Sequence, residues 1–299
     1  MPASIILAFI FVFGLIIGSF LNCLIWRLHE KIPLIPVSAK GGSASGGKGA
    51  NKWKRSCCPK CKTQIAWYDN LPVLSFILLK GKCRHCKKSI SIQYPIVELT
   101  AGILFVIAFI NNFSALGGSA SGGQFSIFNF QTIFNIQFSI SNYKLLIALV
   151  RDWFLISVMI VIFIYDLRWY QILDKVTLPA CLVVLIFNFL LNFSLWNLLF
   201  SGIIGGGFFL IQFVISRGKW IGGGDIRLGL LMGLGLGWPA VLLAIIISYF
   251  IGSVIGVGLI LAGKKNWGSE VPLGVFLAVG AIISLFWYEP ILNWYLNIF

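Results

Sequence analysis

Four cysteines form two Cys-x-x-Cys pairs within one polar stretch of the chain. Cys58 and Cys61 make the first pair, Cys83 and Cys86 make the second, and residues 62–82 separate them. Thiolates at this spacing can converge on one ion and leave no coordination position open for water. The pattern therefore predicts a closed, structural zinc site, although the spacing alone does not decide whether Cys57 replaces Cys58.

A second chemical pattern is an aspartate that follows three glycines. Gly222, Gly223 and Gly224 lead directly into Asp225, which opens an apolar stretch. A carboxylate inside a membrane is costly, so Asp225 is a functional candidate by default. The alternative is an aspartate that caps a helix after a glycine turn. Small residues continue at intervals of four, which predicts close packing of a neighbouring helix along one face: Gly229, Gly233 and Gly237.

A further aspartate, Asp166, begins a polar turn over residues 166–175. Two neighbouring carboxylates share one proton, so one can activate water while the other protonates the leaving group of a peptide bond. The two histidines of the chain, His29 and His85, both lie in a basic loop, and no paired-histidine metalloprotease motif is present. The aspartates therefore indicate either acid–base hydrolysis or ion coupling in a transporter.

The composition indicates that these groups are held by membrane-spanning helices. Of 299 residues, 59% are hydrophobic and only 11% are charged, which is too apolar for a soluble domain of this size. Runs of about 20 apolar residues, the length that crosses a bilayer, recur along the chain. The first run lacks a basic leader, so we expect a retained span rather than a cleaved signal peptide.

We predict an all-α polytopic membrane protein with about eight transmembrane helices and a small zinc-binding module. The expected spans are residues 4–26, 94–113, 145–165, 176–193, 198–216, 225–237, 240–262 and 271–293.

The distribution of basic residues predicts the orientation. With eight spans, the loops on one side carry 21 of the 23 Lys and Arg, and the other side carries only Lys144 and Arg151. Basic loops remain cytoplasmic, so we expect a cytoplasmic zinc loop, both termini outside, and Asp166 and Asp225 on the same inner face. The net charge of +14 thus follows membrane topology and does not indicate nucleic-acid binding. Disulfides are disfavoured in such a reducing compartment.

Three local features complete the sequence pattern. Gly-Gly-Ser-Ala-Ser-Gly-Gly occurs identically at 41–47 and 117–123, which indicates two inserted flexible linkers. Arg151 and Asp152 are expected to form an interfacial or locally paired couple at a span end. Cys23 and Cys181 are expected to be small core residues.

The motif Gly222-Gly223-Gly224-Asp225 fits the GxGD signature of intramembrane aspartyl proteases, and the whole chain resembles bacterial type IV prepilin peptidases. The resemblance covers nearly the full length outside the two linkers. Leu173, Glu270 and Leu273 depart from the usual pattern of the family and affect only the expected loop geometry. The stretches that carry the resemblance are Gly18–Leu28, the paired Cys-x-x-Cys loop, Gln93–Leu99, Asp166–Pro179 and Val271–Gly274.

The resemblance implies that Asp166 and Asp225 form a catalytic dyad that removes the short basic leader of a prepilin or pseudopilin at the cytoplasmic membrane face. Asp174 is the rival for the first position, and a capping or interfacial role is preferred for it. Glu98 is expected to be a buried support, part of a second site, or a satisfied span-end carboxylate. The resemblance also implies methylation of the new N-terminus with S-adenosylmethionine, which no glycine-rich nucleotide motif in the chain supports independently.

The expected organisation is a first transmembrane helix over 1–26, a cytoplasmic zinc-binding loop over 27–92, a second transmembrane helix over 93–113, an outer loop over 114–143 and a six-helix protease core over 144–299. The expected partners are a prepilin and the lipid bilayer of the bacterial inner membrane. Two alternatives stay open: a proton- or sodium-coupled transporter that uses the same aspartates, and a zinc-bearing membrane scaffold without catalysis.

Overall fold

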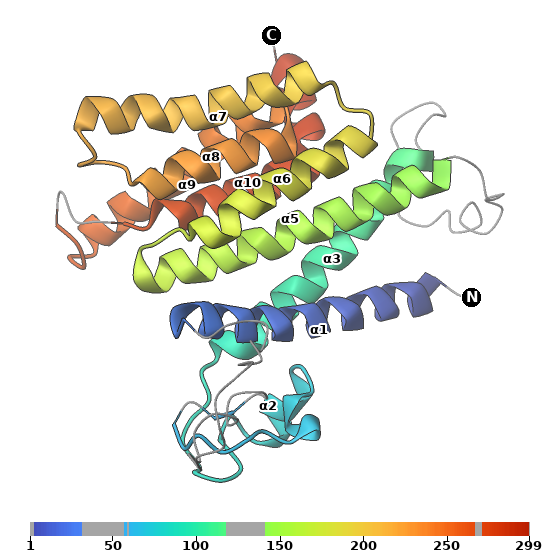
Figure 1. Cartoon of the computed structure of the whole chain (residues 1–299), viewed down its shortest axis with the longest axis vertical. Helices are drawn as coiled ribbons and strands as arrows, with labels where there is room; N and C mark the ends of the chain where they lie inside the picture. The colour runs from blue at the N-terminus through green and yellow to red at the C-terminus, as the bar shows by residue number, and fades with distance from the viewer. Residues whose placement is uncertain (1–2, 32–56, 59, 118–140, 267–270, 299) are drawn as a thin grey trace, which may run out of the picture. The chain divides into compact units, whose positions relative to one another are not determined.

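The computed structural model describes residues 3–31, 57–58, 60–117, 141–266 and 271–298, and within these ranges the chain is almost entirely helical (Figure 1). A 3-10 turn η1 (Trp67–Asn70) and a short helix α2 (Leu74–Leu78) lie in the polar loop. The long helices are α1 (Ala3–His29), α3 (Gln93–Gly117), α5 (Ser141–Trp169), α6 (Asp174–Leu190), α7 (Leu195–Ser216), α8 (Gly223–Leu236), α9 (Ala240–Leu261) and α10 (Leu273–Leu296).

Each predicted span corresponds to one of these long helices, and the all-α polytopic class is confirmed. Among the described residues, six helices are long and apolar enough to cross a membrane. The other two are shorter, with 17 residues in α6 and 14 in α8. The predicted count of about eight spans is therefore approximate. The two linker sequences lie outside the described residues, apart from Gly117 at the end of α3.

The chain divides into two compact units, Met1–Val106 and Ile107–Phe299, with the boundary inside α3. In the first unit, glycines bring α1 and α3 into backbone contact. A Cβ atom added to Gly14 would lie 2.7 Å from the Gly102 Cα, and one added to Gly18 would lie 2.6 Å from the Glu98 Cα. Side chains at these positions would therefore force the two helices apart.

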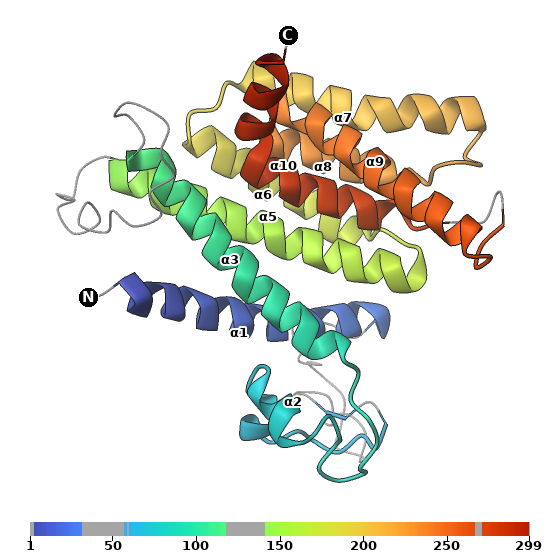
Figure 2. The ribbon, with the colours of Figure 1, turned by 180° about the vertical axis from the view of Figure 1, so that it is seen from behind.

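In the second unit, α8 contacts α6, α7, α9 and α10 (Figure 2). The predicted small-residue face is confirmed on its α7 side. A Cβ on Gly229 would lie 2.4 Å from the Gly205 carbonyl oxygen, and one on Gly233 would lie 2.2 Å from the Ser201 carbonyl oxygen. The Ser201 hydroxyl also donates to the Gly233 carbonyl at 2.7 Å. The remaining face of α8 is part of the hydrophobic core and includes Leu228, Leu231 and Met232.

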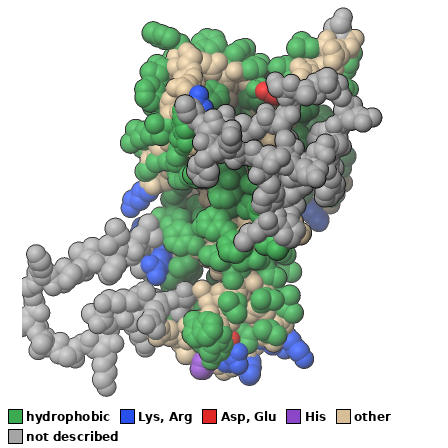
Figure 3. All heavy atoms as spheres, turned by 90° about the vertical axis from the view of Figure 1, so that its right-hand side faces the viewer, with side chains coloured by type: hydrophobic (Ala, Val, Ile, Leu, Met, Phe, Trp, Pro, Cys, Tyr) green, Lys and Arg blue, Asp and Glu red, His purple; other side chains and the backbone are tan. Residues whose placement is uncertain are grey.

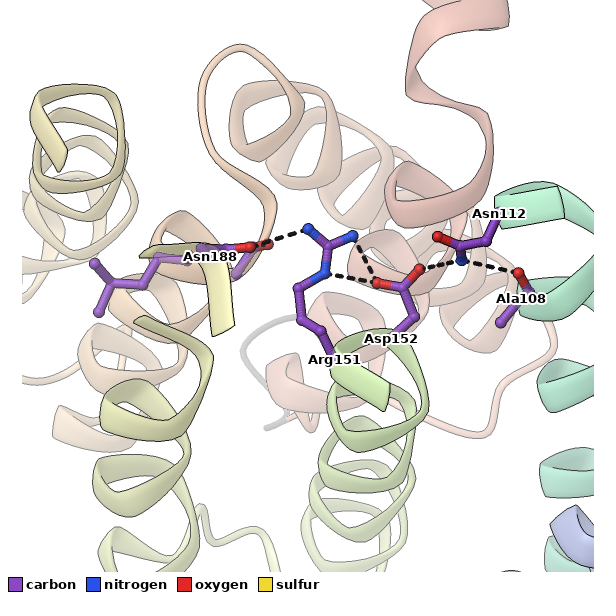
Figure 4. A network of polar contacts seen from close by, with 7 residues as sticks. Ala108, Asn112, Arg151, Asp152 and Asn188 are labelled. Atoms are coloured by element: carbon purple, nitrogen blue, oxygen red, sulfur yellow. Dashed lines mark hydrogen bonds and ion pairs between the residues drawn. The ribbon is translucent and has the colours of Figure 1, made fainter. Parts of the chain in front are cut away.

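A buried polar network joins four helices of the second unit (Figure 4). Arg151 pairs with Asp152 at 2.7 Å and donates to the Asn188 side chain at 2.9 Å. Asn112 donates to the other Asp152 oxygen at 2.7 Å, and Asn188 donates to the Leu234 carbonyl at 2.6 Å, in the last turn of α8. The predicted local pairing is confirmed, but Asp152 is only 4% exposed, so the pair is internal rather than interfacial.

Candidate active site and metal centre

The four predicted zinc ligands come together in the first unit. The sulfur atoms of Cys58, Cys61, Cys83 and Cys86 all lie within 4.8 Å of one another. The Cys58–Cys86 and Cys61–Cys83 sulfurs are each 4.0 Å apart. Tetrahedral zinc with Zn–S distances of about 2.3 Å requires sulfur atoms roughly 3.8 Å apart. The four sulfurs therefore fit one zinc ion with only small adjustment.

The two cysteine pairs adopt the same backbone turn, and this equivalence resolves the choice between Cys57 and Cys58. The Cys58 N–H donates to the Thr63 carbonyl at 2.9 Å, as the Cys83 N–H does to the Lys88 carbonyl at 2.9 Å. One residue earlier, the bridge between Cys57 and Gln64 matches the bridge between Lys82 and Ser89. Cys57 thus occupies the position equivalent to Lys82, outside the ligand set.

The turns also favour thiolates at two of the four positions. Side-chain and backbone hydrogen bonds from Thr63 lower the pKa of Cys61 to about 6. Backbone N–H groups of Cys86 and His85 lower the pKa of Cys83. At Cys86 the Lys88 N–H favours the thiolate, but desolvation and the neighbouring thiols outweigh it and raise the pKa to about 11. Four thiolates this close together repel one another unless a cation lies among them.

Asp225 lies in the first turn of α8, in the second unit, and closes the turn that precedes it. Its Oδ2 accepts a hydrogen bond from the Gly222 N–H at 3.0 Å, and the residue is only 8% exposed. The capping contact expected for Asp225 is therefore present, and the carboxylate is also buried within the protein. A Cβ on Gly223 would find no atom within 4 Å, so the glycine turn before Asp225 is open at this position.

Asp166 lies in the last turns of α5, with its carboxylate at the N-terminus of α10. Its Oδ2 accepts a hydrogen bond from the Val275 N–H at 3.2 Å, and the Gly274 N–H is a second donor. The residue is 5% exposed. Helix N-termini favour negative charge, because their first N–H groups have no partner within the helix. Asp166 at α10 and Asp225 at α8 both receive this stabilisation.

One side chain connects the two aspartates. A Cβ on Gly224 would lie 2.8 Å from the Ile172 Cβ, and a Cβ on Gly274 would lie 3.0 Å from the Ile172 Cδ1 and 2.8 Å from the Asp166 Oδ2. Ile172 thus packs on the glycine turn of Asp225 and on the helix start that binds Asp166. The surroundings of two carboxylates that are far apart in the sequence therefore share one packing contact, Ile172.

Known proteins match the chain over nearly its whole length. The Bacterial Peptidase A24 N-terminal domain matches residues 12–112, and the Type IV leader peptidase family matches residues 153–257. A prepilin leader peptidase/N-methyltransferase of Aeromonas hydrophila is 30% identical over 302 residues, which cover 97% of this chain and 93% of the relative. This chain belongs to the type IV leader peptidase family.

Other relatives carry the same name. The protein from Aeromonas salmonicida strain A449 is 29% identical over 96% of this chain and 93% of its own length. The one from Pseudomonas aeruginosa is 28% identical over 95% of this chain and 91% of its own length. No solved structure matches the chain. The family expected from the sequence is thereby confirmed, and no comparison supports the transporter alternative.

In this member of the leader peptidase family, Asp174 differs from the two buried carboxylates because it is half exposed and forms an ion pair. It is the first residue of α6 and follows the capping residue Leu173, so of the capping and interfacial roles expected for Asp174 the structure favours the interfacial one. Its side chain is 49% exposed and pairs with Arg227, one turn into α8. This pair links the turn after α5 to the helix of Asp225. Arg227 stands two residues after Asp225, and no sequence pattern pointed to its partner Asp174.

Glu98 belongs to the first unit of this leader peptidase relative and is a satisfied carboxylate. It is 6% exposed, its Oε2 accepts the Val73 N–H at 2.8 Å, and the Ser19 hydroxyl is a further donor. Of the three roles expected for it, this geometry favours a structural one that ties the polar loop to α3.

Ile172 and Gly274 were not among the site residues expected from the sequence. Gly274 could have been found, because it lies in Val271–Gly274, a stretch that carries the family resemblance.

Proposed function

We propose that this protein is a bifunctional prepilin leader peptidase and N-methyltransferase of the inner membrane. It removes the short leader of a type IV prepilin or pseudopilin and methylates the new N-terminus. The observation that supports the peptidase half is that two buried carboxylates, Asp166 and Asp225, each lie at a helix N-terminus and that Ile172 packs beside both. The names of relatives that match more than nine tenths of the chain support both halves.

We assign peptide hydrolysis to the pair Asp166 and Asp225. Two adjacent carboxylates repel each other when both are ionised, so the pair holds one proton. The ionised member takes a proton from a water molecule as its oxygen attacks the scissile carbonyl carbon. The protonated member donates to the carbonyl oxygen, and the amine nitrogen then leaves with a proton as the C–N bond breaks. Gly223 has no side chain and no neighbouring atom within 4 Å of its Cβ position, which leaves room for an extended substrate backbone along the glycine turn before Asp225.

The dyad is proposed to act at the cytoplasmic face, where a basic leader would lie. Asp166 is near the end of α5 and Asp225 is at the start of α8, so both carboxylates are at helix ends rather than at mid-span. The bias of Lys and Arg toward the loops on this side supports the same orientation, with both termini outside.

We propose that zinc bound by Cys58, Cys61, Cys83 and Cys86 stabilises the fold of the polar loop. Four thiolates fill a tetrahedral site, so this metal has no open position for a reacting water. S-adenosylmethionine is the proposed methyl donor, on the strength of the relatives' names. The described part of the chain contains no glycine-rich nucleotide motif that would hold it.

Leader removal is tested by expressing the protein together with a prepilin and following the mobility of the pilin. We expect Asp166→Asn and Asp225→Asn each to abolish cleavage, because either change removes one carboxyl of the pair. Asp174→Asn is the matched control and should retain cleavage, because Asp174 is half exposed and pairs with Arg227. Cleavage by both the Asp166→Asn and the Asp225→Asn variants would refute the assignment. If Asp174→Asn abolished cleavage and Asp166→Asn did not, Asp174 would replace Asp166 in the dyad.

Methylation is tested by mass spectrometry of the mature pilin N-terminus. One additional methyl group on the α-amine is expected, and an unmodified amine in every preparation would remove this activity.

A further inference from the structure

The zinc-binding loop carries an apolar ridge on its surface, formed by η1 and α2. Trp67 is 80% exposed, Leu78 77%, Ile77 63% and Leu74 59%. Tyr68 and Leu71 are about half exposed on the same segment. Contiguous exposed apolar side chains of this kind mark an interaction surface rather than ordinary surface scatter.

The second cysteine pair holds this ridge in place. Arg84, between Cys83 and Cys86, donates two hydrogen bonds to the Asp69 carboxylate at 2.8 and 2.6 Å. Its guanidinium also lies 5.3 Å from the centre of the Tyr68 ring, and Tyr68 packs edge-on against Trp67. The hydrogen bonds from Arg84 lower the pKa of Asp69. The metal-binding turn therefore presents the aromatic residues of the ridge in a fixed orientation.

The surroundings of the ridge are strongly basic. Figure 3 shows hydrophobic and basic side chains together on the surface of the chain. Asp69 is the one acidic residue between 57 and 92, and Arg84 pairs with it. This charge attracts an anionic surface and repels the basic leader of a prepilin. The basic residues of this segment are Lys60, Lys62, Lys80, Lys82, Arg84, Lys87 and Lys88.

A hydrogen bond within the first unit fixes the depth of the ridge. The Val73 N–H, directly before α2, donates to the Glu98 carboxylate at 2.8 Å. Glu98 is five residues beyond Gln93, the first residue of the membrane-spanning helix α3. At about 1.5 Å per residue, this places the start of α2 beside α3 roughly 7 Å from its end. Interfacial helices bury their apolar faces about 5–10 Å into the boundary between headgroups and acyl chains.

We propose that the apolar ridge Trp67–Leu78 inserts into the leaflet of the bilayer that borders the zinc-binding loop, with the surrounding lysines on anionic lipid headgroups. Trp67 and Tyr68 lie at the headgroup level, as aromatic residues do in membrane proteins. Leu74, Ile77 and Leu78 contact acyl chains. The zinc site then has a task beyond local folding, since it holds a membrane anchor beside the start of α3.

Photo-crosslinking of the full chain identifies the occupant of the ridge. The variants Trp67→p-benzoylphenylalanine and Leu78→p-benzoylphenylalanine are reconstituted in vesicles of phosphatidylethanolamine and phosphatidylglycerol, irradiated and analysed by mass spectrometry. Gln64→p-benzoylphenylalanine, at an exposed, uncharged position outside the ridge and its lysines, is the matched control. Retention of zinc verifies that each variant has folded, and the readout does not depend on peptidase activity.

We expect phospholipid adducts at positions 67 and 78 and several-fold fewer at position 64. Replacing phosphatidylglycerol with phosphatidylcholine should reduce the adducts at position 67 several-fold, because the basic surroundings lose their anionic partner. Adducts to this chain, to a second copy or to a co-reconstituted prepilin would show that protein covers the ridge and would overturn the proposal. Zinc-loaded protein without adducts at either position would place the ridge in water and overturn it as well.

Discussion

At the scale of single residues, the site depends on side chains that position other groups rather than react. Ile172 packs against the glycines beside both aspartates, and Gly274 leaves room for the Asp166 carboxylate. The sequence identified Asp166 and Asp225 because carboxylates are rare in apolar stretches. It could not identify Ile172, because an isoleucine in a membrane protein has no distinguishing chemistry. Its role follows only from the meeting of α5, α8 and α10.

The ligand set of the metal centre gives a prediction at the same scale. Cys58→Ser should remove bound zinc, because Cys58 is one of the four converging sulfurs. Cys57→Ser should keep one zinc per chain, because Cys57 matches Lys82 in the second turn. Metal analysis of the two purified variants distinguishes them, and loss of zinc with Cys57→Ser but not with Cys58→Ser would exchange their roles. The sequence could not decide this, because both cysteines have acceptable spacing.

At the scale of helices, the packing of α7 against α8 determines where Asp225 lies. The interval of four between glycines predicted one close-packed face of α8, and the contacts with Gly205 and Ser201 confirm it. Sequence could not name the partner helix, because several spans carry small residues. Composition could not predict the lengths of α6 and α8 either. Both helices are apolar, but neither is long enough to be counted as a span by itself.

Two glycines of α7 test this packing as a matched pair. A Cβ on Gly205 would lie 2.2 Å from the Gly229 carbonyl oxygen, whereas a Cβ on Gly207 would have no atom within 4 Å. Gly205→Ala should therefore separate α7 from α8, with a stability loss of about 1–3 kcal/mol, and impair cleavage. Gly207→Ala should be neutral or slightly stabilising. Thermal unfolding in detergent compares them, and equal midpoints would contradict the close contact.

The buried network of Figure 4 gives a second prediction for the helices. Asp152→Ala should destabilise the protein by about 3–5 kcal/mol, because it leaves the Arg151 charge without its anion. The double variant Arg151→Met with Asp152→Leu should recover most of that loss, since no charge remains unpaired. Unfolding midpoints in detergent measure both. A double variant less stable than Asp152→Ala would show that the network contributes more than charge compensation.

For the whole molecule, the chain combines a unit that holds a zinc-binding loop with a six-helix unit that holds two carboxylates. Composition and the basic loops were sufficient to predict a polytopic helical protein, because the bilayer restricts spanning segments to a narrow range of lengths. The boundary between the units, inside α3 at Val106, follows from contacts and not from sequence. The predicted linkers at 41–47 and 117–123 lie outside the described residues, apart from Gly117, and stay predictions.

The central claim is that Asp166 and Asp225 act as one catalytic unit, and a double-mutant comparison of cleavage rates tests it most directly. Rates are measured with purified protein and a prepilin for Asp166→Asn, Asp225→Asn and the combined variant, with zinc content and unfolding midpoint as folding controls. Each single variant should lose on the order of 10³-fold in rate, and the combined variant should be no slower, because groups that act as a unit are not additive. A folded single variant that keeps more than about a tenth of the rate, or losses that multiply in the combined variant, would contradict the account.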